Sequence, residues 1–471
     1  MINNFDVAII GAGVAGMKAA LILNEYELDI CVIDDGNSAG GQFVRYPNAK
    51  PTKASPPSYK KGLEQVEKFE NLNITYFNKS ELIFINKDKE IVFKDKDKNL
   101  YEINPKTIII ATGAREIVQP FKGWDLPGVI TTGAMQILLK SSGRTFAKEA
   151  VIAGSGILPY AAGATWLDKG GEITSFYDTN SFADKFSMLT SALSSSEKRP
   201  DFFSLLPKMM KLQTKAKNSY RVIEAKGRNK LESIIVAQIN NQGEIIEKTK
   251  FEQKTSLLAI GEGLIANLDV ASLASCEATY DKTLGGMILK TNEKLETTVS
   301  GIFAAGALTG VGGADKAELE GEYCAYSVLE KLGKLDIEEY RLHTYTLNNK
   351  RVKILEFSNL LSSMQQFNIP LLSKLDKNTT ICRCEDIKLE DIQNSIESGF
   401  TSINSIKKRT RAGMGNCQGK TCSEIVRNIL LSYKIEDNNS ISVRPPLRPT
   451  SIKCLSSEIT KIDSKKIIWK S

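Results

Sequence analysis

Four of the eight cysteines in this 471-residue sequence lie close together near its C-terminal end. They are Cys382, Cys384, Cys417 and Cys422, in the pattern CxC-x32-CxxxxC. Four thiolates at such spacings can hold either a zinc ion or an iron–sulfur cluster. Zinc ligands more often come as CxxC pairs, so the pattern favours an iron–sulfur cluster, with structural zinc and, after it, disulfides as the alternatives.

The residues around the cysteines indicate how these thiols are positioned. Residues 423–434 have the apolar spacing of a helix, so Cys422 is expected near a helix N-terminus, where the dipole and exposed amides stabilise thiolates. The glycine-containing stretch 412–416 supplies flexible backbone that can fold closely around sulfur atoms. A basic run beside the cluster is either a solvated face or a docking surface for an acidic partner. The run comprises Lys407, Lys408, Arg409 and Arg411.

A glycine-rich loop near the N-terminus predicts a nucleotide-binding site. It joins an apolar strand at residues 5–10 to a helix-patterned stretch at 17–23. The loop comprises Gly11, Gly13, Val14, Ala15 and Gly16. Gly11 permits the tight turn, Gly13 lets the backbone approach a pyrophosphate at the helix N-terminus, and Gly16 lets helix and strand pack closely.

An acidic residue stands where this type of loop requires one. The next apolar strand, 29–33, ends at Asp34, which is 23 positions after Gly11. A carboxylate there accepts hydrogen bonds from the hydroxyls of an adenosine ribose. Strand, loop, helix, strand and acid occur in register, so a dinucleotide fold is a better interpretation than a structural turn.

A second strand, loop and helix follow in the middle of the chain. Strand 149–153 leads into Gly154 and Gly156, and the strand after the helix ends at Asp178, 24 positions after Gly154. The third glycine is replaced by Pro159, which fits a first helical turn but changes the close packing. Three interpretations stay open: a working nicotinamide nucleotide site, a relic fold, or a site that holds an adenine nucleotide (NAD or ATP) structurally.

Three further glycine-containing segments indicate which nucleotide the first fold binds. Their candidate residues are Gly41 and Gln42, then Ala111, Thr112 and Gly113 after an apolar strand, and finally Gly306, Gly312 and Gly313. This order resembles the two-dinucleotide-fold flavoprotein family related to glutathione reductase. The resemblance implies an α/β fold in which FAD lies extended along the first domain, bound by the glycine loop, by Asp34 and by these segments. It also implies NAD(P) at the second loop, and a helix N-terminus near the flavin that stabilises negative charge on the reduced ring.

Two departures from this family bear on the chemistry. Ala307 stands where the family has an aspartate, so a hydrogen bond to the flavin chain is missing. The cysteine pair that disulfide reductases keep beside the flavin is also missing, since Cys31, Cys276 and Cys324 stand alone. Isolated cysteines in apolar segments usually act as small hydrophobic residues, so the electrons of the flavin are expected to leave by another route.

The cysteine pattern resembles the small [2Fe-2S] domain of the bacterioferritin-associated-ferredoxin type. With the segments GWDLPGV (residues 123–129), GIFAAG, CRCED, MGNCQGKTC and VRPPLRP, the resemblance covers nearly the full chain. The whole looks like the larger flavin-plus-cluster subunit of heteromeric bacterial amino-acid and amine dehydrogenases. That group includes the B subunit of hydrogen cyanide synthase, the A subunit of opine oxidases, and the alpha subunits of proline or hydroxyproline dehydrogenases.

This resemblance implies an electron-transfer subunit. A separate catalytic FAD subunit would oxidise the C–N bond of an amino acid or amine, and this chain would relay the electrons through its own FAD and [2Fe-2S] cluster. A small ferredoxin-like subunit is a further partner that the group allows. Two alternatives stay open: a self-sufficient NAD(P)H-dependent flavin and iron–sulfur reductase, and a zinc-stapled scaffold without catalytic activity.

The same motifs place the expected domain boundaries. We expect an FAD-binding domain at 1–115 and 295–335, a second and degenerate dinucleotide fold at 116–294, a connecting helical segment at 336–376, a small helical [2Fe-2S] domain at 377–436 and an extended tail at 437–471.

The remaining features of the sequence exclude several classes of function. The formal net charge of +7 is modest for this length, and no basic cluster with interleaved aromatics precedes residue 400, so nucleic-acid binding is not expected. The single histidine, His343, lies in no ligand or base pattern, which argues against Ser-His-Asp and HExxH chemistry. No apolar run could span a bilayer or act as a signal peptide, and the cysteine usage fits a reducing compartment. We therefore expect a cytoplasmic protein, with at most peripheral membrane association.

Overall fold

The computed structural model describes residues 5–44, 57–181, 207, 210–281, 283–284, 286–363 and 368–461. These residues form two compact units. The first unit takes its residues from 1–114, 265–359 and 442–471, and the second takes them from 115–264 and 360–441. Each unit is therefore built from segments that lie far apart in the sequence.

A five-stranded parallel sheet forms the centre of the first unit. Its order is β20 (Ile302–Ala304), β7 (Pro105–Ile110), β1 (Phe5–Ile10), β2 (Ile30–Ile33) and β3 (Thr75–Phe77). The inner strands are nearly continuous runs of buried apolar residues, as expected for a parallel sheet that is covered on both faces.

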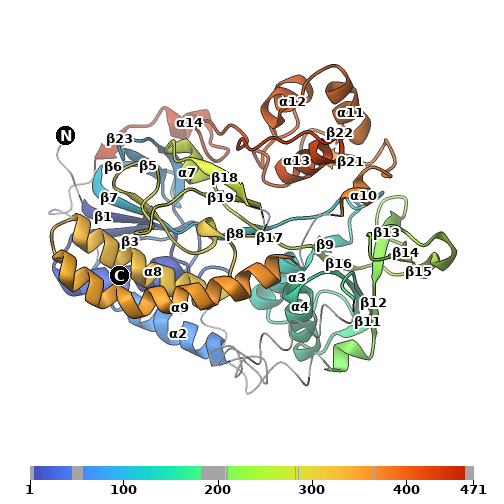
Figure 1. Ribbon diagram of the computed structural model, residues 1–471, viewed down its shortest axis with the longest axis horizontal. Helices are drawn as coiled ribbons and strands as arrows, with labels where there is room; N and C mark the ends of the chain where they lie inside the picture. The colour runs from blue at the N-terminus through green and yellow to red at the C-terminus, as the bar shows by residue number, and fades with distance from the viewer. Residues whose placement is uncertain are drawn as a thin grey trace. The chain divides into compact units, whose positions relative to one another are not determined.

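Helices cover one face of this sheet (Figure 1). They are α1 (Val14–Leu23), α2 (Pro57–Glu70), α8 (Gly313–Lys331) and α9 (Ile337–Ser363). Helices α1 and α8 approach each other closely at Gly321, where a Cβ atom would lie 2.2 Å from the carbonyl oxygen of Ala15. Helix α9 lies along α8, and the hydroxyl of Tyr340 donates to the hydroxyl of Tyr323 at 3.2 Å. These contacts hold the helix that begins at Gly313 against the glycine-loop helix.

Smaller elements complete the first unit. A four-stranded sheet has the order β23 (Ile459–Lys461), β6 (Leu100–Ile103), β5 (Ile91–Lys94) and β4 (Glu81–Ile85), and β18 (Ala278–Asp281) pairs with β19 (Gly286–Leu289). Short helices are η1 (Asn24–Tyr26), α7 (Asp269–Leu273), η3 (Gly306–Thr309) and α14 (Ile452–Leu455). The C-terminal segment returns to this unit, because the backbone N–H of Leu447 donates to the carbonyl of Ile83 and β23 pairs with β6.

The second unit contains the middle of the chain. Its parallel sheet has the order β12 (Ala216–Asn218), β11 (Glu172–Asp178), β10 (Glu149–Gly154), β16 (Leu258–Gly261) and β9 (Val129–Thr131). An antiparallel sheet consists of β13 (Tyr220–Lys226), β14 (Ser233–Gln238) and β15 (Phe251–Lys254), and η2 (Glu247–Thr249) precedes its last strand. Helices α3 (Thr132–Ser142) and α4 (Ile157–Asp168) belong to this fold, and the short strands β8 (Ala114–Glu116) and β17 (Leu264–Ala266) lie at its chain ends.

The four-cysteine segment forms a small, mainly helical part of the second unit. Its elements are α10 (Ile369–Leu372), β21 (Thr380–Cys382), β22 (Ile387–Lys388), α11 (Leu389–Glu397), α12 (Ile403–Thr410) and α13 (Cys422–Ser432). One hydrophobic cluster runs through it and the second dinucleotide fold, joining Trp124 and Val129 to Ile381, Ile425 and Ile429. The small helical part is therefore packed onto the second fold as one folded body.

Replacing Gly321 with alanine is expected to destabilise the first unit. The added Cβ would meet the backbone of α1 at 2.2 Å, so the two helices must move apart, at a cost of about 1–3 kcal/mol. Thermal unfolding of the full chain measures the loss. Gly333→Ala is the control, because a Cβ at Gly333 meets no atom within 4 Å and adds only the strain of its φ of +70°. Unchanged stability of Gly321→Ala would contradict the close approach of the two helices.

Candidate functional site

The first glycine loop has the geometry of a backbone that must stay free of side chains. A Cβ at Gly11 would lie 2.5 Å from the carbonyl oxygen of Ala111, and a Cβ at Gly16 would lie 1.9 Å from that of Gly11. Gly13, by contrast, has no atom within 4 Å of its Cβ position. It caps helix α1 without a side-chain bond, and Val14 and Ala15 form the first turn. The N-terminal amides of α1 are thus available to an anionic group.

The carboxylate of Asp34 and the Gly41–Gln42 segment lie beside this loop. Asp34, at the end of β2, accepts hydrogen bonds from the backbone N–H of Ala12 at 2.9 Å and of Gly36 at 3.0 Å. A Cβ at Gly41 would lie 2.9 Å from the Cα of Gly13, so the backbones of the two glycines are in close contact. Gln42 follows as an exposed residue. The loop, the acid and this segment therefore form one continuous surface.

The Ala111–Gly113 segment is held by a residue that sequence reasoning missed. The side-chain amide of Asn267 donates to the carbonyl of Thr112 at 3.0 Å, and the hydroxyl of Thr112 donates to the carbonyl of Asn267 at 2.8 Å. The backbone N–H of Asn267 also donates to the carbonyl of Gly113. This clamp joins residues more than 150 positions apart, and no local motif marks Asn267.

The late glycine segment forms a turn in front of α8. Gly306, with φ of +79°, opens η3, and Gly312 is the residue before α8. Gly313, with φ of +83°, is the first residue of that helix. Ala307 is half-buried within η3 and carries no polar side-chain atom. The turn is instead tied to buried charged residues that sequence reasoning missed, because the N–H of Gly306 donates to Oε2 of Glu320 at 3.0 Å.

All of these segments lie at one edge of the first sheet. Ile10, Ile33, Ile110 and Ala304 are partners across the four parallel strands β1, β2, β7 and β20. Each is the last residue of its strand. The site segments follow these strand ends directly or within two positions, and they are the glycine loop, Asp34, Ala111 and Gly306. The carboxyl edge of a parallel sheet is where such folds bind nucleotides.

The four clustered cysteines come together in the second unit as two pairs. The thiol of Cys382, at the end of β21, forms a hydrogen bond with that of Cys422, the first residue of α13. The thiols of Cys384 and Cys417 pair in the same way. Cys382 and Cys422 are buried, Cys384 is exposed and Cys417 is half-buried. One pair of thiols is therefore enclosed by protein, and the other pair is accessible to solvent.

The electrostatics around the buried pair favour a thiolate. The hydrogen bond from Cys422 lowers the pKa of Cys382 to about 5 against the opposing effect of burial, and the backbone N–H groups of Gly413, Glu385 and Cys384 add to the decrease. The same bond, together with burial, raises the pKa of Cys422. Backbone N–H groups that point at sulfur are the hydrogen bonds that thiolate ligands of iron accept.

The donor set fits a two-iron cluster. The thiols pair two and two, and in a [2Fe-2S] cluster each iron takes two of the four protein ligands. A Cβ at Gly415 would lie 2.3 Å from the Cβ of Cys384, so the predicted glycine-containing backbone does fold closely around the cysteines.

The cluster segment is attached to the second fold by Trp124 and Arg115. The buried indole N–H of Trp124 donates to the carbonyl of Thr380 at 2.6 Å, and the guanidinium of Arg383 lies 4.4 Å from the centre of the same ring. Arg115 donates from Nε to the carbonyl of Lys420, within the Cys417–Cys422 loop, at 2.8 Å. Arg115 follows Gly113 by two positions in the sequence. Trp124 belongs to the GWDLPGV motif, whose role the sequence alone did not reveal.

The second glycine loop is present, but its acid is already occupied. A Cβ at Gly154 would lie 1.8 Å from the carbonyl oxygen of Gly261, and Gly156 precedes helix α4. Asp178, at the end of β11, is 1% exposed and accepts a hydrogen bond from the hydroxyl of Tyr160 at 2.8 Å. Burial and the Asp178 charge raise the pKa of Tyr160, so this hydroxyl stays a donor. Asp178 is therefore buried beneath its surroundings and bonded to a neighbouring side chain, whereas Asp34 of the first fold is half-buried.

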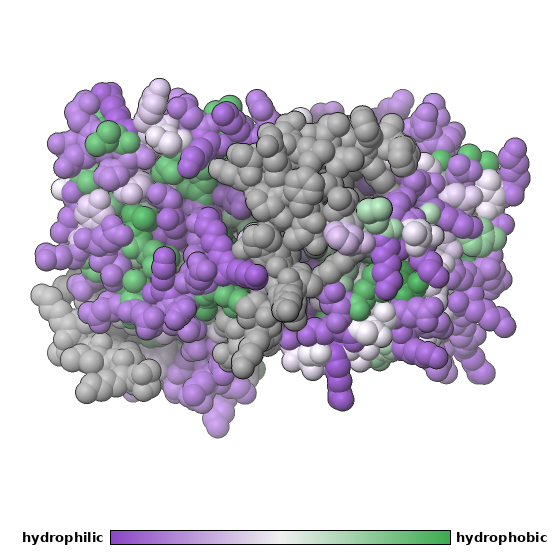
Figure 2. All heavy atoms as spheres, turned by 90° about the horizontal axis from the view of Figure 1, so that it is seen from below, coloured by the Kyte–Doolittle hydropathy of each residue, from purple (hydrophilic) through white to green (hydrophobic). Residues whose placement is uncertain are grey.

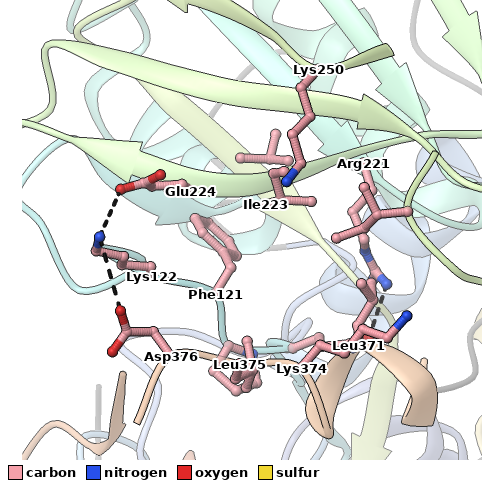
Figure 3. Close-up of a pocket in the computed structure, with 14 residues that line it drawn as sticks. Phe121, Lys122, Arg221, Ile223, Glu224, Lys250, Leu371, Lys374, Leu375 and Asp376 are labelled. Atoms are coloured by element: carbon pink, nitrogen blue, oxygen red, sulfur yellow. Dashed lines mark hydrogen bonds and ion pairs between the residues drawn. The ribbon is translucent and has the colours of Figure 1, made fainter. Parts of the chain in front are cut away.

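A cavity of about 200 Å³ lies in the second unit, between the antiparallel sheet and the segment around α10 (Figure 3). Within its wall, Lys122 pairs with Glu224 at 3.2 Å and with Asp376 at 4.0 Å. The buried Arg221 pairs with Glu262 and also donates to Gln119. No residue predicted to bind a cofactor is among those that line this cavity.

The basic run belongs to the second unit and the single histidine to the first. Lys407, Lys408 and Arg409 form the last turn of α12, and Arg411 pairs with Glu385 at 2.8 Å. His343 is exposed on α9, in the first unit, with its ring stacked on that of Tyr326 at 4.4 Å.

Comparison with known families identifies the first two-thirds of the chain. Residues 5–321 match the family model described as pyridine nucleotide-disulphide oxidoreductase. The chain belongs to this family. Residues 380–432 match the model of the BFD-like [2Fe-2S] binding domain, which contains all four clustered cysteines. The predicted fold class, the oxidoreductase assignment and the cofactors FAD and [2Fe-2S] are confirmed by these matches.

Relatives extend the similarity over nearly the whole chain. The protein is 26% identical over 469 residues to the A subunit of opine oxidase from Rhizobium meliloti, a match that covers 95% of this chain and 86% of the relative. It is 25% identical over 427 residues to the HcnB subunit of hydrogen cyanide synthase from Pseudomonas protegens. That match covers 89% of this chain and 90% of the relative. The predicted resemblance to this group of proteins is thereby confirmed.

A solved structure with a similar fold is the crystal structure of L-proline dehydrogenase from P. horikoshii. The TM-score is 0.69 at 19% sequence identity, and the match covers 96% of this chain and 79% of that chain. This likeness supports the fold assignment of both units.

The described surface on one face is mainly hydrophilic, with hydrophobic residues in separate small groups (Figure 2). Among the helices that the structure describes, none has both the length and the apolar character needed to cross a bilayer.

Replacing Tyr160 with phenylalanine is expected to lower the free energy of unfolding by about 1–3 kcal/mol, because the buried carboxylate of Asp178 loses a hydrogen bond. Urea unfolding of the full chain measures this change. Tyr433→Phe is the control, since Tyr433 is 38% exposed at the end of α13. Equal stability of the two variants would show that Tyr160 does not hold Asp178.

Proposed function

We propose that this protein is the electron-transfer subunit of a heteromeric FAD-dependent amino-acid or amine dehydrogenase. The observation that carries the proposal is the combination, in one chain, of a nucleotide-binding sheet edge and a separate set of four paired cysteines. The other four cysteines are all buried. Three of them, Cys31, Cys276 and Cys324, have a thiol whose pKa is raised by burial, which disfavours a reactive thiolate.

The residues at the sheet edge are proposed to hold FAD. The amides after Gly13 at the start of α1 would bind its pyrophosphate, and Asp34 would accept from the adenosine ribose. The Ala111–Gly113 segment and the Gly306–Gly313 turn would hold the rest of the cofactor. Cys382, Cys384, Cys417 and Cys422 are proposed to ligate the cluster. When bound, the two groups supply reversible electron transfer, which the protein tunes through hydrogen bonds and charge.

The oxidation of the C–N bond is assigned to a partner. The names of the relatives describe them as subunits, which supports the presence of a separate catalytic chain that contains FAD. Other features stay predictions: a small ferredoxin-like partner, a cytoplasmic location, peripheral membrane association, and an adenine nucleotide (NAD or ATP) at Gly154 and Gly156. The expected domain boundaries also stay predictions.

The occupied acid of the second fold supports a relay over a self-sufficient NAD(P)H reductase. Asp178 is 1% exposed and hydrogen-bonded to Tyr160, so the hydroxyls of a ribose could reach it only after the surrounding side chains move. The cost of this rearrangement lowers the affinity for a dinucleotide. Electrons are therefore proposed to come from the catalytic partner.

The decisive experiment is an absorption spectrum of the chain purified without oxygen, with flavin, iron and zinc analysis. The relay predicts flavin bands, cluster absorption and about two irons per chain. Dithionite should bleach the spectrum and NADH should not. Bleaching by NADH would support the self-sufficient reductase, and zinc without flavin would support a scaffold.

Replacing Cys422 with serine is expected to remove most of the iron and the cluster absorption while leaving the flavin bands. The reason is that the buried half of the ligand set loses a sulfur. Cys454→Ser is the matched control, because Cys454 is also buried but lies in the first unit, with its thiol bonded to the carbonyl of Lys98 at 3.2 Å. Equal iron content in the two variants would contradict the ligand assignment.

A further inference from the structure

A buried network of charges lies behind the Gly306–Gly313 turn. The ammonium of Lys316 donates to the carbonyl of Gly306 at 2.8 Å, to the hydroxyl of Thr309 at 2.6 Å and to Oε2 of Glu320 at 2.9 Å. The same Glu320 oxygen accepts from the N–H of Gly306 at 3.0 Å and from the hydroxyl of Thr309 at 2.6 Å. Both backbone polar groups of Gly306 are thus bonded to one lysine–glutamate pair.

The stem of Lys316 also supports the other end of the turn. A Cβ at Gly312 would lie 2.4 Å from Cδ of Lys316 and 2.3 Å from the hydroxyl oxygen of Ser358 on α9. The chain at Gly312 therefore rests directly on the lysine side chain. Lys316 contacts the turn at its first residue and at the residue before α8, so its position fixes the shape of the whole turn.

The network carries an excess positive charge. Arg351, on α9, donates from Nε to Oε1 of Glu320 at 3.0 Å, so two cations share one carboxylate. Lys316 is 1% exposed, Glu320 is fully buried and the side chain of Arg351 is 18% exposed. Burial works to raise the pKa of Glu320, but Lys316 and Arg351 hold it below its ordinary value. Burial lowers the pKa of Lys316, against the attraction of Glu320.

Such a network is not explained by stability alone. Desolvation of buried ion pairs largely cancels their attraction, so an apolar replacement would hold the two helices equally well. The network contacts Gly306 and Thr309, which lie on either side of Ala307. Ala307 stands where the family resemblance implies an aspartate, and it has no polar side-chain atom.

We propose that the Lys316–Glu320–Arg351 network positions the Gly306–Gly313 turn for FAD and, through its net positive charge, favours the reduced, anionic flavin. This inference rests on the proposed function, which places FAD at this turn. A positive charge in a low-dielectric interior stabilises added negative charge nearby, and it acts together with the N-terminus of α8. Lys316 and Arg351 act here as positioning and charge-setting residues.

The test measures FAD affinity and the flavin midpoint potential in the full chain for three variants. Lys316→Met should weaken FAD binding about tenfold, because the turn loses charge-assisted bonds, and should shift the potential to more negative values. Arg351→Met should shift the potential in the same direction with little effect on affinity, since Arg351 does not contact the turn. Lys331→Met is the control: Lys331 lies at the far end of α8, paired with Glu296 at 3.1 Å, and should leave both quantities unchanged.

The outcomes separate the two proposals. Flavin-free wild-type protein would overturn the proposed placement of FAD. Flavin-loaded wild type with unchanged affinity and potential in Lys316→Met and Arg351→Met would overturn the network inference alone. If Lys316→Met does not fold, two other variants decide. Lys316→Arg keeps the positive charge and should keep the wild-type flavin potential. Arg351→Met removes one positive charge and should shift the potential to more negative values. A wild-type potential in Arg351→Met would then contradict the electrostatic role.

Discussion

The register of the first parallel sheet is the constraint on which the candidate flavin site depends. Ile10, Ile33, Ile110 and Ala304 end their strands side by side, although they come from positions spread over nearly 300 residues. A shift of one residue in any strand would move the following turn by about 3.3 Å and reverse its side chains. The close approach of Gly11 to Ala111 leaves no space for such a shift.

Much of this arrangement could be predicted because its signals are local. Strand, glycine turn, helix and acid follow one another within 30 residues, so the loop at Gly11 and Asp34 could be recognised without knowledge of the fold. The cysteine spacing likewise indicated a cluster, and the structure gathers those four thiols in pairs. The start of α13 at Cys422 agrees with the predicted helix N-terminus.

The supporting residues could not be predicted, because their partners are distant in the sequence. Asn267 clamps Thr112 across 155 positions, and Trp124 bonds to Thr380 across 256. Nothing in the local pattern of α8 shows that Lys316 and Glu320 are buried, since a lysine and a glutamate four positions apart usually form an exposed pair. The hydrogen bond from Tyr160 to Asp178 could not be predicted either, because the sequence shows only an acid at the position expected for ribose binding.

The unequal burial of the cysteine pairs gives the cluster site a polarity. Cys382 and Cys422 are enclosed by protein, whereas Cys384 is exposed and Cys417 is half-buried. Charge added to a group held by both pairs is solvated better on the side of Cys384 and Cys417, where water can reorient around it. The two halves of the site are therefore inequivalent before any partner binds. The solvent-exposed half, at Cys384 and Cys417, is also the half that oxygen and chelators reach first.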